Sequence, residues 1–327
     1  MHFVIVGAGA LGSIYAAYLA RDGHRVSLIA RGERATSLAR HGIPVTGQDN
    51  FTATCDVVTR PEGLREADVV IVAVKTYDTQ QALAPLRNLV TKCAFSVQNG
   101  VLKDRQLSEV FGTQATLGAI SMVGGDVLPA EGDLPGAVRY NMANPTIIGE
   151  IADGASTRVE QIVNAMRHAG LAAQASDDIV SAEWSKFVAW SGFSTLAVLT
   201  RLPTWRFMSD PDTAPLVARV MRESAAVAIA HGVTLQDSGF SSRAFIEGTE
   251  EDAVRAVQAH GERMRANAPG FRQSILQDAD RNRRLEVNET LDYAVSLGRE
   301  LGVATPTLDL CCRVLRSVSR ANADGRP

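Results

Sequence analysis

The chain has 327 residues, 46% hydrophobic and 21% charged, a composition typical of a globular protein long enough for two domains. The net charge of −3 gives no basic footprint for nucleic acid, and no apolar run is long enough to span a bilayer. Its four cysteines, Cys55, Cys93, Cys311 and Cys312, form no CxxC pair and have no histidine at metal-ligand spacing. The opening segment also lacks the regions of a signal peptide. We therefore expect a cytoplasmic protein with reduced thiols, no metal, and no nucleic-acid or membrane partner.

The first thirty residues have the pattern of a βαβ unit. Residues 3–6 form a short apolar strand, residues 11–20 are small and apolar with helical spacing, and residues 26–29 form a second strand. Between the first strand and the helix stands a glycine turn with the GxGxxG pattern, Gly7-Ala8-Gly9-Ala10-Leu11-Gly12.

A GxGxxG pattern indicates a dinucleotide site where it follows a strand and begins a helix, as it does here. Gly7 permits the tight turn, Gly9 lets the backbone approach a pyrophosphate, and Gly12 allows close packing of the helix on the sheet. The amides and dipole at the helix N-terminus then favour a bound phosphate. The turn predicts a dinucleotide site; the alternative is a tight turn in an α/β fold that binds no nucleotide.

The chain at the end of the second strand indicates which dinucleotide binds. An NAD site usually has a carboxylate there, whereas this chain has Arg31, with Arg34 one turn further on and Glu33 between them. A guanidinium suits a 2′-phosphate in both charge and geometry. The pattern favours NADP(H), and the alternative is an ordinary surface arginine.

The alternation of strands and helices continues to about residue 176. We expect further strands over 55–59, 69–74, 94–98, 117–123 and 146–148, and a helix over 79–90. This order predicts an α/β fold with a doubly wound parallel sheet of the Rossmann type.

From Asp177 onward the periodicity is helical. We expect helices over 177–199, 212–231, 250–267, 274–301 and 307–320. The predicted organisation is a Rossmann-type NADP-binding domain over 1–176 and an all-α substrate domain over 177–327, with the active site in the cleft between them. A homodimer is a reasonable expectation for such a helical domain.

Polar residues follow two of the predicted strands. Lys75 comes directly after residues 69–74, and Asn99 comes directly after residues 94–98. Ligands of doubly wound sheets lie beyond the carboxyl ends of the strands, so both side chains are candidates for contact with cofactor or substrate. The alternatives are a solvated loop lysine and a turn-forming asparagine before Gly100.

The helical half offers three further candidates. Lys186 lies among apolar and aromatic neighbours, a setting that can lower a lysine pKa and make it a usable acid. A lysine extended to solvent is the alternative. Glu286 and Ser274 read as a helix carboxylate and an N-cap, twelve residues apart on one helix.

In sequence, the chain resembles the ketopantoate reductase family over essentially its whole length. The matching stretches, in order, are Gly7–Gly12, Val74-Lys75-Thr76, Gln98-Asn99-Gly100, Glu183-Trp184-Ser185-Lys186, Ser274-Ile275-Leu276-Gln277-Asp278 and Leu285-Glu286-Val287-Asn288. The resemblance implies that NADPH delivers hydride to the keto carbon of a small 2-oxo acid.

The same resemblance assigns roles to individual residues. Lys186 aligns with the general acid that stabilises the charge developing on the keto oxygen. Glu286 aligns with a glutamate that contacts the reaction centre, and Ser274 with a serine that binds the substrate carboxylate. Lys75 aligns with a cofactor-binding position, and Asn99 with one near both cofactor and substrate.

Three positions depart from the family pattern. Members that reduce ketopantoate commonly carry asparagine four and eight residues after the lysine, where this chain has Trp190 and Ser194. A third position, often asparagine, is Phe271. We expect Trp190 and Ser194 to contact the substrate. If the two aromatic residues line the pocket, it is more apolar than usual; the alternative is that they belong to the core or to an interface.

Three functions therefore remain open. The first is reduction of 2-dehydropantoate (ketopantoate) to pantoate, and the second is turnover of a bulkier or aromatic 2-oxo or 2-hydroxy acid. The third is a dinucleotide-binding sensor without catalysis.

Overall fold

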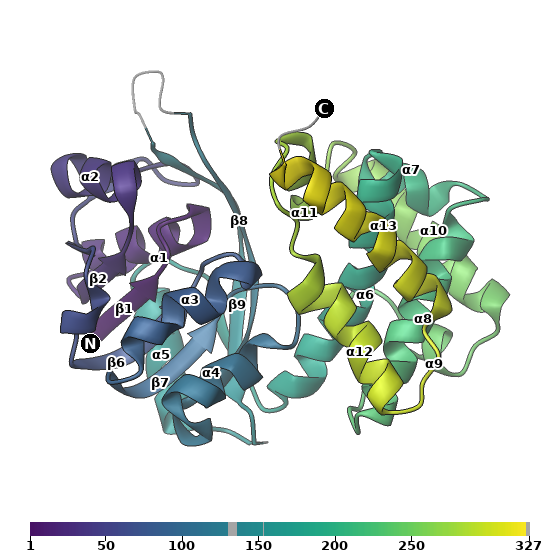
Figure 1. The fold of residues 1–327 in the computed structure, drawn as a ribbon, viewed down its shortest axis with the longest axis horizontal. Coiled ribbons are helices and arrows are strands. Elements are labelled where there is room, and N and C mark those ends of the chain that lie inside the picture. The colour runs from purple at the N-terminus through teal and green to yellow at the C-terminus, as the bar shows by residue number, and fades with distance from the viewer. Residues whose placement is uncertain (130–135, 153, 325–327) are drawn as a thin grey trace. The chain divides into compact units, whose positions relative to one another are not determined.

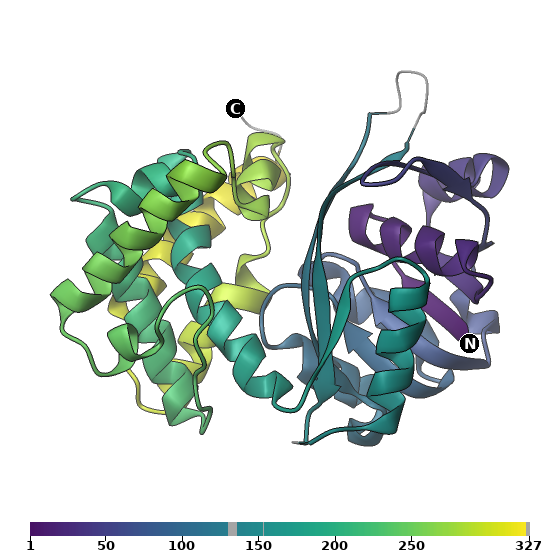
Figure 2. The same cartoon turned by 180° about the vertical axis from the view of Figure 1, so that it is seen from behind.

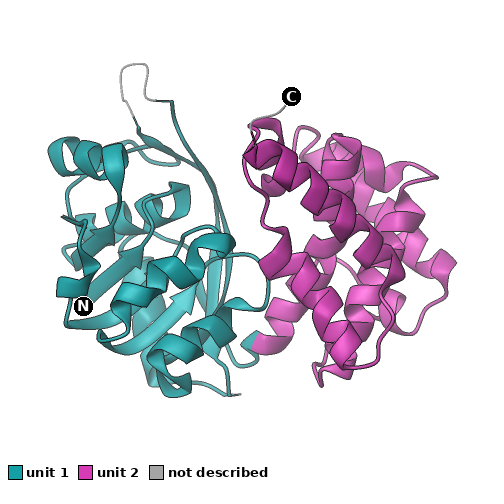
Figure 3. Cartoon of the chain, viewed as in Figure 1, with its two compact units in different colours: residues 1–179 teal, residues 180–327 magenta. Residues whose placement is uncertain are grey.

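A computed structural model describes residues 1–129, 136–152 and 154–324 of the chain. The chain forms two compact units, residues 1–179 and 180–327, coloured separately in Figure 3. The expected domain boundary, residue 176, is the last residue of strand β10 (Ala173–Ser176).

A five-stranded parallel sheet forms the centre of the first unit. Its strands, in order, are β5 (Asp56–Val58), β2 (Arg25–Ile29), β1 (His2–Val6), β6 (Glu66–Val72) and β7 (Val90–Ser96). Every pair in this sheet is parallel. Val6 is opposite Val72, and Val72 is opposite Ser96, so three strands end in register. The Rossmann-type α/β fold expected for this half is confirmed.

Alternate residues of β1 point into two different cores. Phe3 and Ile5 pack with α1 (Ala10–Arg21) on one face of the sheet, whereas Val4 and Val6 face the opposite side. This period of two explains why the strand is apolar throughout, since both faces are covered. The second face is covered by short helical segments, namely α3 (Thr79–Leu83), the 3₁₀ turn η3 (Ala84–Leu86) and α4 (Lys103–Phe111).

Outside α1 lies a second, mixed sheet (Figure 1 and Figure 2). It contains β10, β9 (Val138–Glu150), β3 (Ile43–Gly47) and β4 (Phe51–Ala53), with β8 (Leu117–Val127) antiparallel to β9. The strands expected over 117–123 and 146–148 belong to this sheet and not to the parallel one. The order of strands along the chain does not distinguish between these two placements.

Two sequence-based expectations in this unit need correction. The helix expected over 79–90 ends at Leu83, because Pro85 cannot continue it, and Val90 already begins β7. Three helices were not expected, α2 (Gly32–His41), α4 and α5 (Thr157–His168). Helix α2 buries only Ala35 and Leu38, so it has a weak apolar signal.

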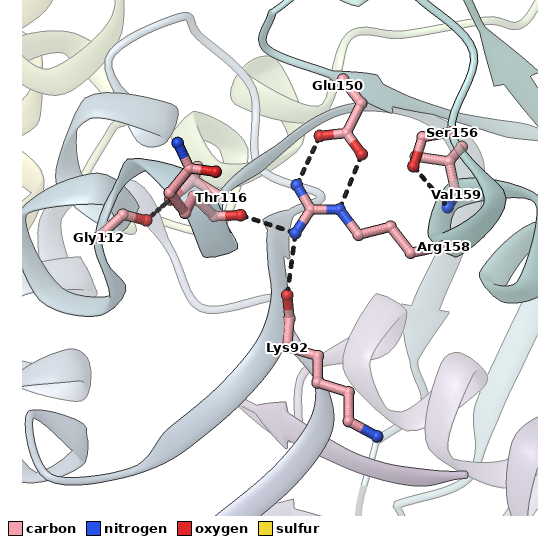
Figure 4. Close-up of polar contacts among 8 residues, drawn as sticks. Lys92, Gly112, Thr116, Glu150, Ser156, Arg158 and Val159 are labelled. Carbon is pink, nitrogen blue, oxygen red and sulfur yellow. Dashed lines mark hydrogen bonds and ion pairs between the residues drawn. The ribbon is translucent and has the colours of Figure 1, made fainter.

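One arginine joins α5 to three other segments (Figure 4). Arg158 donates to both carboxylate oxygens of Glu150 at the end of β9, at 2.7 and 2.5 Å. It also donates to the backbone carbonyls of Lys92, at 3.1 Å, and of Gln114, at 2.6 Å. Ser156 caps the same helix by accepting from the Val159 amide. Arg158 therefore connects both sheets and the chain before β8.

We expect Arg158→Met to lower the free energy of unfolding by about 2 kcal/mol at neutral pH, since it leaves the Glu150 carboxylate without its partner. The hydrogen bond from Arg158 lowers the pKa of Glu150 from its usual 4.5. The stabilisation is therefore complete above pH 4.5 and is lost as the pH falls through the folded-state pKa. Urea unfolding from pH 7 down to pH of about 3 should show a smaller acid destabilisation in the variant. Arg105→Met is the control, because the side chains of its pair with Glu109 are 70% and 58% exposed. Equal losses in the two variants would contradict this account.

The second unit is helical and is built around α6 (Ile179–Thr200). Most residues of α6 are buried, which fits a helix that is apolar on all sides. Gly192 brings α6 close to α8 (Ala214–Ala230), because a Cβ at Gly192 would lie 2.7 Å from Cγ of Met221. The other helical segments are α7 (Thr204–Ser209), α9 (Arg243–Ile246), α10 (Glu250–Asn267), α11 (Ser274–Asp280), the π-helical turn η5 (Val287–Leu291), α12 (Asp292–Glu300) and α13 (Pro306–Ala323).

The single helix expected over 274–301 is wrong. Helix α11 ends at Asp280, and Asn282 has a φ of +51°, a left-handed conformation that asparagine tolerates better than most residues. Arg283 donates its amide to the carbonyl of Asp278, at 2.9 Å, which closes the turn. The basic run 281–284 forms this exposed turn.

No helix in the described ranges is long and apolar enough to cross a membrane.

Candidate active site

The glycine turn lies at the carboxyl end of β1. Gly7 has a φ of +108°, a conformation that favours glycine, and its amide donates to the carbonyl of Ile29 at 3.2 Å. A Cβ on Gly7 would lie 2.7 Å from Cγ1 of Val74, in the chain that follows β6. The tight turn and the neighbouring loop therefore fit together only because residue 7 is glycine.

The other two glycines of the turn have different surroundings. A Cβ on Gly12 would lie 1.9 Å from the carbonyl oxygen of Gly7, so α1 can approach the turn only without a side chain there. Gly9 precedes α1, has no side-chain cap, and has open space where a Cβ would stand. An open, uncapped helix N-terminus reached by bare backbone fits the pyrophosphate of a dinucleotide. Ala8, Ala10 and Leu11 complete this turn.

Lys75 and Asn99 emerge from the same edge of the sheet as the glycine turn. Val72 and Ser96 are opposite each other in adjacent parallel strands, and each candidate lies three residues beyond its strand partner. The backbone hydrogen bonds between these strands continue past the strand ends. The amide of Ala73 donates to the carbonyl of Val6 at 2.9 Å, and the amide of Val97 donates to the carbonyl of Val72 at 3.0 Å. Both candidate side chains are half-buried. The first unit thus gathers its predicted cofactor residues at one edge.

Gln98 holds the Lys75 loop, a role that the sequence did not reveal. Its buried amide nitrogen donates to the Val74 carbonyl and to Oγ1 of Thr79, both at 2.8 Å. Oγ of Ser96 donates to its amide oxygen at 2.8 Å. A glutamine immediately before Asn99 was the available sequence signal, and the two groups that accept from it, on Val74 and Thr79, lie in another segment.

The two arginines after β2 differ in environment. Arg31 is the exposed N-cap residue of α2, and its side chain makes no hydrogen bond or ion pair with any residue that the structure describes. Arg34 is half-buried and contacts the backbone of the glycine turn, where Nε donates to the Ala8 carbonyl at 3.2 Å. Only Arg31 is therefore available for a ligand at the end of β2.

In the second unit, α6 carries the predicted acid and two of the three unusual residues in one stripe. Lys186, Trp190 and Ser194 are four residues apart and share a helix face. Lys186 is half-buried, whereas Trp190 is 8% exposed and packs against Phe187 with ring centroids 6.2 Å apart. Ser194 is fully buried, and its hydroxyl has no hydrogen-bond partner among the described residues.

Ser274 is the exposed first residue of α11, and the N-cap expected at this position is Gln273 instead. The side-chain nitrogen Nε2 of Gln273 donates to Oγ1 of Thr204, at 3.4 Å. The carbonyl of the half-buried Phe271 accepts from the Thr204 amide at 3.1 Å. Helix α7 thus anchors the segment that leads into Ser274 and leaves the serine accessible.

Glu286 is buried and immediately precedes η5, so it does not share a helix with Ser274. Its carbonyl accepts a hydrogen bond from Oγ1 of Thr290. The preceding residue, Leu285, donates its amide to Oγ of Ser319 on α13 at 2.9 Å. Positioning of Glu286 by α13 depends on tertiary contacts that sequence patterns do not indicate.

These features define a class of protein, the dinucleotide-dependent oxidoreductases that combine a Rossmann-type domain with a helical second domain. The family model described as ketopantoate reductase PanE/ApbA matches residues 3–153, and the model of its C-terminal domain matches residues 178–319. The chain belongs to the ketopantoate reductase family, whose members are oxidoreductases that act on a keto or CH–OH group.

Individual relatives are similar over nearly the whole chain. A 2-dehydropantoate 2-reductase of Archaeoglobus fulgidus is 28% identical over 91% of both chains. The crystal structure of a PanE/ApbA family ketopantoate reductase from Ralstonia eutropha has a TM-score of 0.83 and 26% identity, with 99% of this chain and 100% of that chain covered. A D-mandelate dehydrogenase solved with NADH and anilino(oxo)acetate shares the fold, with a TM-score of 0.82 at 19% identity over 99% and 100% of the two chains.

Proposed function

We propose that this chain reduces a 2-oxo acid to a 2-hydroxy acid with NADPH, and that 2-dehydropantoate is the best named substrate. The observation that carries the proposal is the glycine turn with Lys75 and Asn99 at one edge of the parallel sheet. The exposed Arg31 at the end of β2, without a carboxylate at that position, supports NADPH over NADH. The name of the substrate rests on relatives such as the Archaeoglobus enzyme.

Bound NADPH supplies the hydride that reduces the keto carbon. In our proposal the ammonium of Lys186 donates a proton to the keto oxygen as its negative charge develops, and solvent returns that proton later. The hydroxyl of Ser274 binds the substrate carboxylate, and Glu286 contacts the reaction centre. Asn99 contacts substrate and cofactor, and Lys75 the cofactor. The balance is one hydride and one proton added across the C=O bond.

A bulkier, apolar 2-oxo acid is the second candidate substrate. Trp190 replaces a polar position on the stripe that holds Lys186, and Ser194 beyond it makes no hydrogen bond within the described ranges. An apolar surface there leaves the hydroxyl group of a hydroxylated substrate without a hydrogen-bond partner. That loss, more than a steric clash, weakens the binding of such a substrate. The close packing of Trp190 on Phe187 supports the opposite interpretation, in which the tryptophan is a core residue.

The first test is NADPH oxidation, followed optically, with 2-dehydropantoate and a panel of aliphatic and aromatic 2-oxo acids. Preference for 2-dehydropantoate supports the proposed substrate. Preference for another acid keeps the reaction and replaces the substrate, whereas no turnover of any acid contradicts the proposal. The cytoplasmic location and the homodimer stay predictions.

Trp190→Asn separates the two substrate candidates. We expect the ratio of kcat/KM for 2-dehydropantoate to that for phenylpyruvate to rise about tenfold, because an amide replaces apolar surface beside the substrate. Leu310→Asn on α13 is the control, since it introduces the same amide at a leucine that is 63% exposed. A ratio unchanged in a folded Trp190→Asn variant would show that Trp190 belongs to the core.

A further inference from the structure

Arg34 connects three separate segments around the glycine turn. From α2, its Nε donates to the Ala8 carbonyl at 3.2 Å, and one terminal nitrogen donates to Oγ of Ser13 at 3.1 Å. Its other terminal nitrogen donates to the carbonyl of Gly136, two residues before β9. Ser13 in turn donates to the Ala8 carbonyl at 3.2 Å, which closes the network.

The geometry of this network restrains the turn at its centre. The Ala8 carbonyl accepts from both Arg34 and Ser13, so the peptide between the first two glycines cannot rotate without breaking both bonds. That peptide determines how Gly9 and the N-terminus of α1 present their amides. Gly7 and Gly9 contribute no side chains that could stabilise the same conformation.

The charge of Arg34 is also unusual for a half-buried group. No carboxylate within the described ranges pairs with it, and burial lowers the pKa of Arg34 without a compensating anion. An arginine remains protonated in this setting, so a positive charge lies beside the turn where a pyrophosphate would bind. Both the restraint and the charge act on the part of the ligand that NADH and NADPH share.

We propose that Arg34 is a positioning residue of the dinucleotide site, which contributes equally to NADH and NADPH, whereas Arg31 alone recognises the 2′-phosphate. This inference rests on the proposed function only in taking a nicotinamide dinucleotide as the ligand. It assigns different roles to two arginines of one helix turn, which the sequence presents as equivalent.

The test is the dissociation constant of ADP-ribose, NADH and NADPH, measured by titration calorimetry on the whole protein. Arg34→Met is expected to weaken all three about tenfold and to leave the NADPH-to-NADH ratio within about twofold of the wild type. Arg34→Lys keeps the charge but not the forked geometry, so it should rescue binding only in part. Arg31→Met should weaken NADPH alone, by about tenfold or more.

Ser13→Ala supplies an independent variant that removes one acceptor of Arg34 and one donor to Ala8. It should weaken all three ligands by a smaller, equal factor, and it keeps the test usable if Arg34→Met does not fold. A loss confined to NADPH in the Arg34 variants, full rescue by lysine, or a lower melting temperature with unchanged ADP-ribose affinity would each overturn the proposal. Equal affinity of the wild type for NADH and NADPH would contradict the proposed cofactor, while the ADP-ribose result would still test Arg34.

Discussion

Replacing Lys186 with alanine is expected to remove nearly all turnover while dinucleotide binding persists. A positioned general acid contributes roughly 10² to 10⁴ in rate, so a loss of about a thousandfold in kcat is expected. The glycine turn, Arg31 and Lys75 belong to the first unit and are unchanged by this substitution. NADPH oxidation and NADPH affinity, measured on the same preparation, separate the two effects.

The matched control is Lys92→Ala. The side chain of Lys92 is 80% exposed and pairs with Asp68, away from the carboxyl edge of the sheet. Its loss should leave both turnover and affinity unchanged. If Lys186→Ala retained most of its turnover, another group would have to protonate the keto oxygen. If the wild type bound NADPH but reduced no 2-oxo acid, the dinucleotide-binding sensor would become the better interpretation.

The part of the fold that the sequence predicted well is local. The βαβ unit around Gly7 depends on short apolar strands and a glycine turn, and each is encoded by neighbouring residues. The expected helix over 79–90 failed because Pro85 stands within an otherwise helical pattern. The expected helix over 274–301 failed because a polar turn at 281–284 interrupts two helical segments without any glycine or proline.

Long-range pairing was harder to predict. Strands β8 and β9 are longer than expected, and register shifts near Ser121 and Gly124 interrupt the alternation of buried and exposed residues. The place of these strands in a second, mixed sheet depends on β3 and β4, which are short and were not predicted. Periodicity describes a single strand and does not identify its partner.

In the candidate site, too, local features were predicted from the sequence and long-range contacts were not. The residue types of the site follow from motifs, and the structure gathers the glycine turn, Lys75 and Asn99 at one sheet edge. The residues that hold them could not be inferred, because Gln98 and Arg34 act through contacts with segments distant in the sequence. Motifs identify groups that face a ligand, whereas the supporting contacts appear only in the folded chain.

Two substitutions in the glycine turn should separate its structural role from its ligand-binding role. We expect Gly12→Ala to reduce dinucleotide affinity at least a hundredfold and to destabilise the protein by about 2 kcal/mol. The added Cβ would stand 1.9 Å from the Gly7 carbonyl oxygen and 3.3 Å from Cβ of Ala73, so α1 must move away from the turn. That movement displaces the helix N-terminus on which the phosphate site depends.

Gly9→Ala is the matched variant, because the same methyl group is added three residues earlier. Gly9 has a φ of −71° and open space around the position of a Cβ, so the free protein should keep its stability. The methyl group would instead occupy the surface that a pyrophosphate approaches, and affinity for ADP-ribose should fall about tenfold or more. Melting temperature and ADP-ribose affinity together distinguish the variants: both fall for Gly12→Ala, and only affinity falls for Gly9→Ala. Unchanged affinity in Gly9→Ala would mean that the ligand does not approach the turn at Gly9, which would remove the main structural support for a dinucleotide at this site.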